Sequence, residues 1–205
     1  MPRQNRVTPR GSFIATAARG TLMGNRGCLH SDDGRILRAW QVRRWITCVL
    51  SFRGRWRFVM PPGRWTALFF LDEATALAAG HRPCAECRRD DYRRFRDAFL
   101  AAHAGHPPGA DPMDLTLHAA RVDERRMKRT YEAPAASLPN GTFVEIGGQP
   151  WLVQGDRLLA WTPSGYAELR ARPTGHVTVL TPRPTVAAIR AGYMPGVHPS
   201  AAAVP

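Results

Sequence analysis

The clearest chemistry in this 205-residue sequence belongs to two cysteines, Cys84 and Cys87, that are separated by two residues. A C-x-x-C turn places two thiolates where they can share one tetrahedral zinc ion. The same spacing occurs in redox centres, where the pair opens a helix that follows a strand. Here a helix-forming stretch and Pro83 come before the pair, so we interpret it as part of a zinc site.

A zinc site made of protein side chains needs two further ligands, and the sequence offers them at three positions. Cys48 lies on the apolar face of an expected strand, where the alternative is an inert buried cysteine. His30 lies in an expected loop, where the alternative for a lone histidine is a surface residue. We predict that His30, Cys48, Cys84 and Cys87 bind Zn²⁺, with Cys28 as the substitute for His30.

Positive charge is concentrated in the first third of the chain. The formal net charge is +13, and residues 1–64 contribute +11 of it through 13 arginines and two acids. Guanidinium groups bind phosphate through paired, charge-assisted hydrogen bonds and stack on bases. The uneven distribution therefore predicts DNA as the partner, the alternative being a basic chain without a polyanionic partner. The predicted nucleic-acid contacts are Arg26, Arg43, Arg44, Arg53, Arg55, Arg57 and Arg64.

Aromatic side chains are interleaved with these arginines. Trp40, Trp45, Trp56 and Trp65 fall within this basic segment or directly after it. Indole rings mixed with guanidinium groups are typical of surfaces that stack on bases and contact phosphate. The alternative is that most of these tryptophans belong to a hydrophobic core.

Short elements of both kinds must position these residues, so we expect an α+β fold. Alternating apolar residues predict a β-hairpin over 43–60. Asp72 predicts the N-cap of a short helix over 73–79, with Gly80 as its C-cap. A second helix follows the C-x-x-C turn. The expected domains are a flexible basic arm (1–20), a zinc-binding module (21–105), a helical connector (106–136), and a small antiparallel β domain with a terminal helix (137–205).

The second half of the chain combines a helix with a meander of short strands. The helix is expected over 111–131. Gly147-Gly148 and Gly155-Asp156 are two-residue connections of the kind that joins the strands of tight hairpins. The strands on either side of them therefore predict an antiparallel sheet.

One stretch of the first half resembles a known family. In order, it contains Phe69-Phe70, Ala74, Ala79-Gly80 and His81-Arg82-Pro83-Cys84-x-x-Cys87-Arg88. This series resembles the second half of the metal-binding domain of Ada, the bacterial DNA alkylation-repair protein. Met23-Gly24-Asn25 followed by Leu29-His30 is similar to the opening of shorter modules related to that domain. The resemblance covers roughly residues 20–95, and the chain also looks similar to other bacterial proteins of its length.

The resemblance implies that residues 21–105 form an Ada-like module. Within it, Cys84 and Cys87 would bind zinc together with an upstream strand cysteine, matched best by Cys48. In Ada one zinc-bound cysteine also accepts methyl groups from phosphotriesters. This chain departs from that pattern, because the closely spaced upstream pair of cysteines is absent and a longer arginine-rich hairpin takes its place.

The first expected function is a zinc-stabilised DNA-binding protein linked to DNA repair or genome maintenance. One alternative is a DNA-processing enzyme, and a cysteine alkyl acceptor would use Cys48 or Cys28 as a metal-bound thiolate. A zinc deaminase would need H-x-E upstream, where the chain has His30-Ser31-Asp32. The other alternative is a protein-protein adaptor that uses the β domain as its binding module.

A nuclease or glycosylase would draw its acid-base groups from the helix expected over 111–131. The candidate catalytic residues there are His118, Arg121, Asp123, Glu124 and Lys128, because His118 and Arg121 share one helical face. Glu124 and Lys128 lie four residues apart, which is also the spacing of a surface ion pair on a solvated helix. A zinc ion held by four protein ligands would be structural, because a catalytic zinc keeps one position for water.

Features of export and membrane insertion are missing from the sequence. No uncharged apolar run reaches the roughly 18–20 residues that span a bilayer, and no apolar segment follows the basic N-terminus. We therefore expect a cytoplasmic protein without a membrane partner, whose four cysteines are not joined in disulfides.

Overall fold

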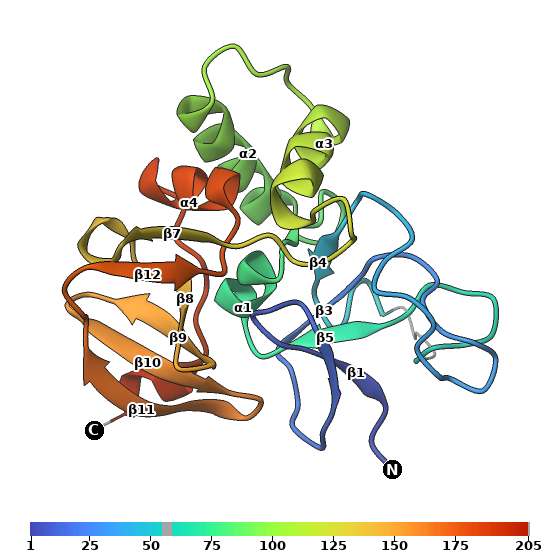
Figure 1. Cartoon of the computed structure of the whole chain (residues 1–205). Coiled ribbons are helices and arrows are strands. Elements are labelled where there is room, and N and C mark those ends of the chain that lie inside the picture. The colour runs from blue at the N-terminus through green and yellow to red at the C-terminus, as the bar shows by residue number, and fades with distance from the viewer. Residues whose placement is uncertain (55–58, 205) are drawn as a thin grey trace.

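The computed structural model describes residues 1–54 and 59–204, which fold into two six-stranded sheets with helices between and above them (Figure 1). This arrangement confirms the expected α+β fold. Among the described residues, no helix combines the length and the apolarity that crossing a lipid bilayer requires.

The first sheet is mixed and belongs to the N-terminal half. Its strand order is β2-β1-β5-β3-β4-β6. The pairs β1/β5 and β4/β6 are parallel, and the other neighbours are antiparallel. The strands are β1 (Gln4–Val7), β2 (Phe13–Ala15), β3 (Leu22–Asn25), β4 (Ile46–Cys48), β5 (Leu68–Phe70) and β6 (Arg82–Pro83).

The start of the chain is part of this sheet, whereas we expected a flexible basic arm over residues 1–20. Val7 is buried against Phe70 and its neighbours. Asn5 is also buried, and its Nδ2 donates a hydrogen bond to the carbonyl oxygen of Ala67 at 3.0 Å. The expectation was based on a composition rich in Arg, Pro and Gly. Composition does not show that Asn5 and Val7, two alternate residues of one short strand, point into a core.

The hairpin expected over 43–60 is only partly described. β4 ends at Cys48, and Met60, expected at the end of the second strand, lies in a bend with a φ of 53°. Trp56 and Phe58, the other apolar residues of that strand, lie outside the described residues.

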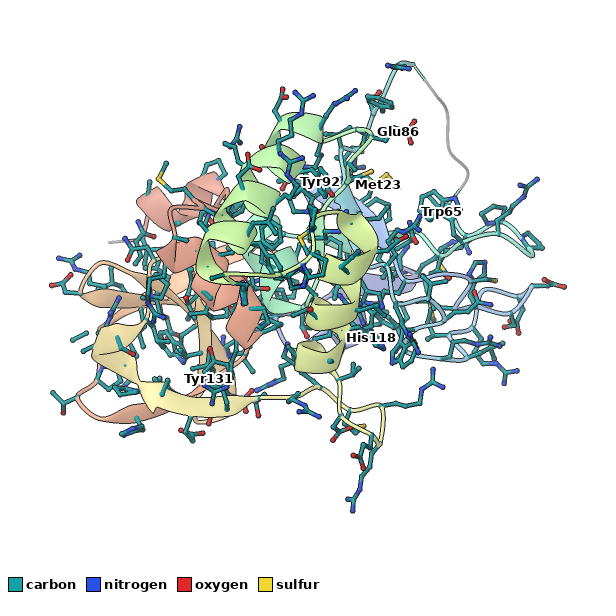
Figure 2. All side chains as sticks on the ribbon, turned by 90° about the horizontal axis from the view of Figure 1, so that it is seen from above. Met23, Trp65, Glu86, Tyr92, His118 and Tyr131 are labelled. Atoms are coloured by element: carbon teal, nitrogen blue, oxygen red, sulfur yellow. The ribbon has the colours of Figure 1, made fainter. Side chains whose placement is uncertain are left out.

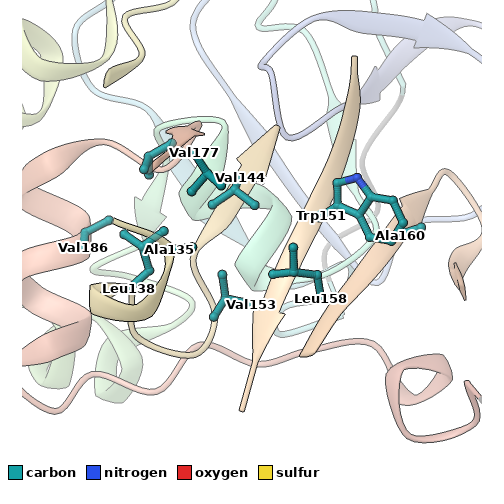
Figure 3. Close-up of a cluster of buried hydrophobic side chains, with 10 residues drawn as sticks. Ala135, Leu138, Val144, Trp151, Val153, Leu158, Ala160, Val177 and Val186 are labelled. Carbon is teal, nitrogen blue, oxygen red and sulfur yellow. The ribbon is translucent and has the colours of Figure 1, made fainter. Parts of the chain in front are cut away.

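The second sheet is antiparallel throughout, with the order β11-β10-β9-β8-β12-β7. The two glycine-containing hairpins are confirmed, because Ile146 pairs with Gln149 and Gln154 pairs with Arg157. Valine and leucine side chains around Trp151 form the core of this half (Figure 3). The strands are β7 (Tyr131–Pro134), β8 (Phe143–Ile146), β9 (Gln149–Gln154), β10 (Arg157–Thr162), β11 (Gly165–Ala171) and β12 (His176–Val179).

Four α-helices and two 3₁₀ helices complete the described fold. The predicted N-cap of α1 is confirmed, because Asp72 accepts a hydrogen bond from the backbone N–H of Thr75 at 2.8 Å. The C-cap is Ala79, and Gly80 follows it in the expected left-handed conformation, with a φ of 93°. α3 ends at Arg121, well before the expected position near residue 131, because residues 123–127 form a tight turn. The helices are α1 (Glu73–Ala78), α2 (Arg89–Ala102), α3 (Ala110–Arg121), α4 (Arg183–Arg190), η1 (Ala135–Ser137) and η2 (Pro199–Ala202).

The short helix α1 joins the two halves, and Figure 1 shows it between the two sheets. All six of its residues are buried. Ala76 packs on the first sheet, Ala74 packs on the second, and Leu77 packs against α2, α3 and α4. The N-terminal and C-terminal halves therefore share one core around this helix.

Candidate metal centre and nucleic-acid interface

Three of the four cysteines come together at one edge of the first sheet. The sulfur atoms of Cys48, Cys84 and Cys87 all lie within 4.8 Å of one another. The parallel pairing of β4 with β6 causes this, since the backbone N–H of Cys84 donates to the carbonyl oxygen of Thr47 at 2.9 Å. Cys48 and Cys84 therefore sit side by side at the ends of their strands.

The C-x-x-C turn presents its two sulfurs to the same point. The backbone N–H of Glu86 donates to Cys84 Sγ at 3.4 Å, and that of Arg88 donates to the Cys84 carbonyl oxygen at 3.1 Å. The turn then leads directly into α2. Met23, Glu86 and Tyr92 mark this end of the molecule in Figure 2. An N–H group aimed at sulfur favours the thiolate over the thiol, which is the form that binds metal.

The geometry and the donor set of this three-cysteine cluster fit a metal ion. Four ligands at the Zn–S distance of about 2.3 Å would lie about 3.8 Å apart at the corners of a tetrahedron. Sulfur atoms within 4.8 Å of one another need only small rotations to reach that arrangement. Cys48 and Cys84 are buried among apolar side chains, and none of the three forms a disulfide. Three thiolates suit a soft or borderline ion, of which zinc is one.

The three thiols share protons unevenly. The hydrogen bond from Cys48 lowers the pKa of Cys84 to about 5, and the same hydrogen bond raises the pKa of Cys48. Burial raises the pKa of Cys87. Three thiolates so close together repel one another unless a cation neutralises them, so a bound metal would favour the deprotonated form of all three.

His30 and Cys28 do not join the cluster. The His30 ring contacts Thr66 Oγ1 through Nδ1 at 2.6 Å and the Pro61 carbonyl oxygen through Nε2 at 3.3 Å. Cys28 Sγ donates to the His30 carbonyl oxygen at 3.9 Å. Within residues 1–54 and 59–204 the metal group is therefore three cysteines, and one position of a tetrahedral ion would remain for a ligand from elsewhere. Histidine and cysteine are suitable donor types, but residue type alone does not show that the ring of His30 already has partners.

The predicted nucleic-acid arginines divide into four groups. Arg43, Arg53 and Arg64 are exposed and make no ion pair with a carboxylate in the described part of the chain. Arg44 is exposed and forms an ion pair with Asp111, with 3.4 Å between Arg44 Nη2 and Asp111 Oδ1. Arg26 is only 2% exposed, so it cannot contact a strand that runs over the surface. Arg55 and Arg57 lie outside the described residues.

The described tryptophans of the basic segment are buried or half-buried in the fold. Trp45 is buried, and its Nε1 donates to the carbonyl oxygen of Val42 at 2.8 Å. The guanidinium carbons of Arg26 and Arg121 each lie 4.0 Å from the Trp45 ring. Trp40 and Trp65 are half-buried, and Trp56 is outside the described residues. Trp45 therefore orients two cations and does not offer a free face to a base.

The candidate catalytic residues after Cys48 do not assemble into an acid-base site. Asp123 Oδ1 accepts from the backbone N–H of Met127 at 2.8 Å and stabilises the turn after α3. Glu124 is exposed. His118 lies on the face of α3 that meets the N-terminal loops (Figure 2), where its Nδ1 accepts from Arg121 Nη2 at 3.1 Å. Burial and then the charge of Arg121 lower the pKa of His118 to about 4, which keeps the ring neutral.

Arg121 and Lys128 lie in surroundings that the sequence did not reveal. They were expected on a charged helix, either as acid-base candidates or as solvated surface residues. Because α3 ends at Arg121, the chain turns back and brings Lys128 beside Arg121 and Arg26. No spacing rule links position 26 to positions 121 and 128, so only the fold could reveal this group.

Comparisons with protein families, with curated proteins and with solved structures give no match for this chain. The resemblance to the Ada metal-binding domain therefore remains an expectation from the residues. The candidate metal centre rests on its own geometry.

Proposed function

We propose that this chain is a zinc-stabilised DNA-binding protein that acts in DNA repair or genome maintenance. The observation that carries the proposal is that three of the arginines expected at DNA, Arg43, Arg53 and Arg64, are exposed and have no carboxylate partner among the described residues. Such cations keep their full charge for a polyanion. Each one that neutralises a DNA phosphate releases a condensed counterion, which favours binding at low salt.

The position of the metal centre supports the same proposal. Cys48 ends β4, the loop segment 49–54 that follows carries Arg53, and the loop segment 59–67 carries Arg64 before the chain returns in β5. A metal held by Cys48, Cys84 and Cys87 would fix the start of this loop to the beginning of α2. The ion would supply a cross-link between thiolates, and the three cysteines would orient the arginine-carrying loop.

The burial of Cys48 favours binding over a cysteine-transfer reaction. Cys48 is 5% exposed and packs with Met23 and Ala67. A buried sulfur is poorly placed to attack an alkyl group on a DNA backbone. The exposed arginines, by contrast, need no rearrangement to meet phosphate.

Salt-dependent binding tests this function. The zinc-loaded chain is titrated with a fluorescent DNA duplex at several salt concentrations, and the anisotropy gives the dissociation constant at each. The test variant replaces Arg43, Arg53 and Arg64 by Ala. The control variant removes the same charge from the other half, where Arg157, Arg170 and Arg190 are also exposed. Each phosphate contact contributes about 0.9 to the slope of log affinity against log salt.

We expect the test variant to lose about two to three from the slope, in proportion to its lost phosphate contacts, while the control variant keeps the slope of the natural sequence. Equal slopes for all three proteins would contradict the proposed surface. Absence of any binding by the natural sequence at low salt would contradict the function itself.

A further inference from the structure

A cavity of about 370 Å³ lies between the N-terminal loops and the turn after α3. It is in the size range of small-molecule sites and is too small for a duplex. Its lining contains five cationic residues and no acidic one. The residues that the argument uses are Arg26, Trp40, Trp45, Arg121, Arg126 and Lys128.

Three cations of this basic pocket are held only by neutral groups. Arg26 donates to the carbonyl oxygen of Gly11 at 2.9 Å and to His81 Nε2 at 3.2 Å. Arg121 donates to the carbonyl oxygen of Gly80 at 2.7 Å, and Lys128 Nζ donates to that of Ala78 at 2.6 Å. In the described part of the chain, none of these three cations forms an ion pair with a carboxylate.

Other buried arginines of the same molecule are neutralised. Arg82 makes a two-pronged ion pair with Asp114, at 2.9 Å from Nε and 2.7 Å from Nη2. Arg88 donates to Glu73 at 2.7 Å. Burying a charge costs stability unless an opposite charge or several hydrogen bonds compensate it. Arg26 and Arg121 of the basic pocket are buried without such a carboxylate partner among the described residues. Fold stability therefore does not explain their burial, which points to binding of an anion.

Two donors of the pocket also have no acceptor. Arg26 Nη2 and Arg121 Nε are buried without a hydrogen-bond partner among residues 1–54 and 59–204, and their residues are 2% and 1% exposed. Gly11 lies against this donor, since a Cβ at that position would lie 3.4 Å from Arg26 Nη2. Burial and the charge of Arg121 lower the pKa of Arg26, and burial with both arginines lowers the pKa of Lys128 to about 7. An anion would satisfy the donors and relieve the repulsion together.

Aromatic rings hold the cations in place. Trp45 stacks on both Arg26 and Arg121, and Arg126 lies with its guanidinium carbon 4.1 Å from the Trp40 ring. Arg126 is exposed, so it stands at the solvent side of the group. Guanidinium groups fixed in this way lose less conformational freedom when they bind a planar or tetrahedral oxyanion.

We propose that the basic pocket binds the terminal phosphate of a single nucleotide, through Arg26, Arg121 and Lys128. A phosphate monoester matches the pocket in charge, since it carries between one and two negative charges near neutral pH and three strong acceptor oxygens. The small cavity accepts one nucleotide at the end of a strand or free in solution, not the interior of a duplex.

The choice of a strand end as the natural source rests on the proposed DNA-binding function. In that setting the exposed arginines would hold the strand, and the pocket would select a 5′-phosphorylated or 3′-phosphorylated end. Free deoxynucleoside monophosphates carry the same chemistry, and the experiment separates the two sources.

Binding is measured with the zinc-loaded chain and three probes: an oligonucleotide with a 5′-phosphate, one with a 3′-phosphate, and the same sequence with hydroxyl ends. Calorimetry with deoxynucleoside monophosphates forms a separate arm. The test variants are Lys128→Gln and Arg126→Gln. The control is Arg125→Gln, which removes the same charge from an exposed neighbour that does not line the cavity. Thermal melting checks that each variant is folded.

We expect one phosphorylated end to bind at least about tenfold more tightly than the hydroxyl end, as a charge-assisted contact to a desolvated phosphate implies. Lys128→Gln and Arg126→Gln should remove this preference, and Arg125→Gln should keep it. Equal binding of all three probes, with no binding of the monophosphates, overturns the pocket while leaving salt-dependent DNA binding intact. Binding of monophosphates without DNA binding supports the pocket's chemistry and overturns the strand end as its source.

Discussion

Replacing Lys128 by Met should stabilise the protein, and by an amount that depends on pH. The Lys128 ammonium is desolvated and lies near Arg26 and Arg121, which lowers its pKa from 10.5 to about 7. Because the unfolded chain binds this proton more tightly than the folded one, the folded state bears the full cost below pH 7. Each tenfold change in a proton-binding constant is worth about 1.4 kcal/mol, so the cost reaches about 5 kcal/mol.

The variant loses one hydrogen bond to the Ala78 carbonyl oxygen, worth about 1 kcal/mol. We therefore expect Lys128→Met to raise the free energy of unfolding by about 4 kcal/mol at pH 6. As pH rises from 7 toward 10.5, the folded protein with Lys128 sheds the proton and the cost declines. At pH 9.5 the gain should fall below about 1 kcal/mol. His81, Arg26 and Arg121 also face this group and would respond to the loss of its charge.

Urea unfolding of the zinc-loaded proteins at pH 6, 8 and 9.5 measures the difference at each pH. Groups that titrate equally in both proteins cancel when the two free energies are subtracted. A difference that stays constant over this range would show that the ammonium is not desolvated, and it would remove one support of the basic pocket.

Two further predictions concern the metal centre and a buried ion pair. Cys84→Ser should release the metal and lower the melting temperature, whereas Cys28→Ser should keep one equivalent of metal; full metal content in the first variant would rule out the cluster. Asp114→Ala should lower the free energy of unfolding by about 3–5 kcal/mol, because it leaves the Arg82 guanidinium buried without its carboxylate. Chemical denaturation measures this loss, and a loss below about 1 kcal/mol would show that Arg82 finds another partner or reaches solvent.

Local signals in the sequence were sufficient for several elements of the fold. Asp72 and Gly80 mark both ends of α1, because a helix leaves backbone donors and acceptors unpaired at its ends. Gly147, Gly148 and Gly155 supply positive φ angles in the two-residue turns of the hairpins. The two cysteines of the C-x-x-C turn and the strand position of Cys48 likewise indicated the cluster.

Other features depend on contacts between distant parts of the chain. Arg26 was expected at a DNA surface, yet Trp45 and Arg121, which come from remote segments, enclose it. His30 is a residue type that binds metals, but its two ring nitrogens contact the Thr66 hydroxyl and a backbone carbonyl oxygen. Composition and spacing describe single segments, so they could identify neither the partners of these side chains nor the pocket that they help to form.

Binding of a DNA duplex to the zinc-loaded chain, measured at low and at physiological salt, tests the central claim most directly. The account predicts one bound zinc, clear binding at low salt, and an affinity that falls steeply as salt rises, since exposed arginines would release counterions from several phosphates. A chain that carries its metal but does not bind DNA at low salt would contradict the account.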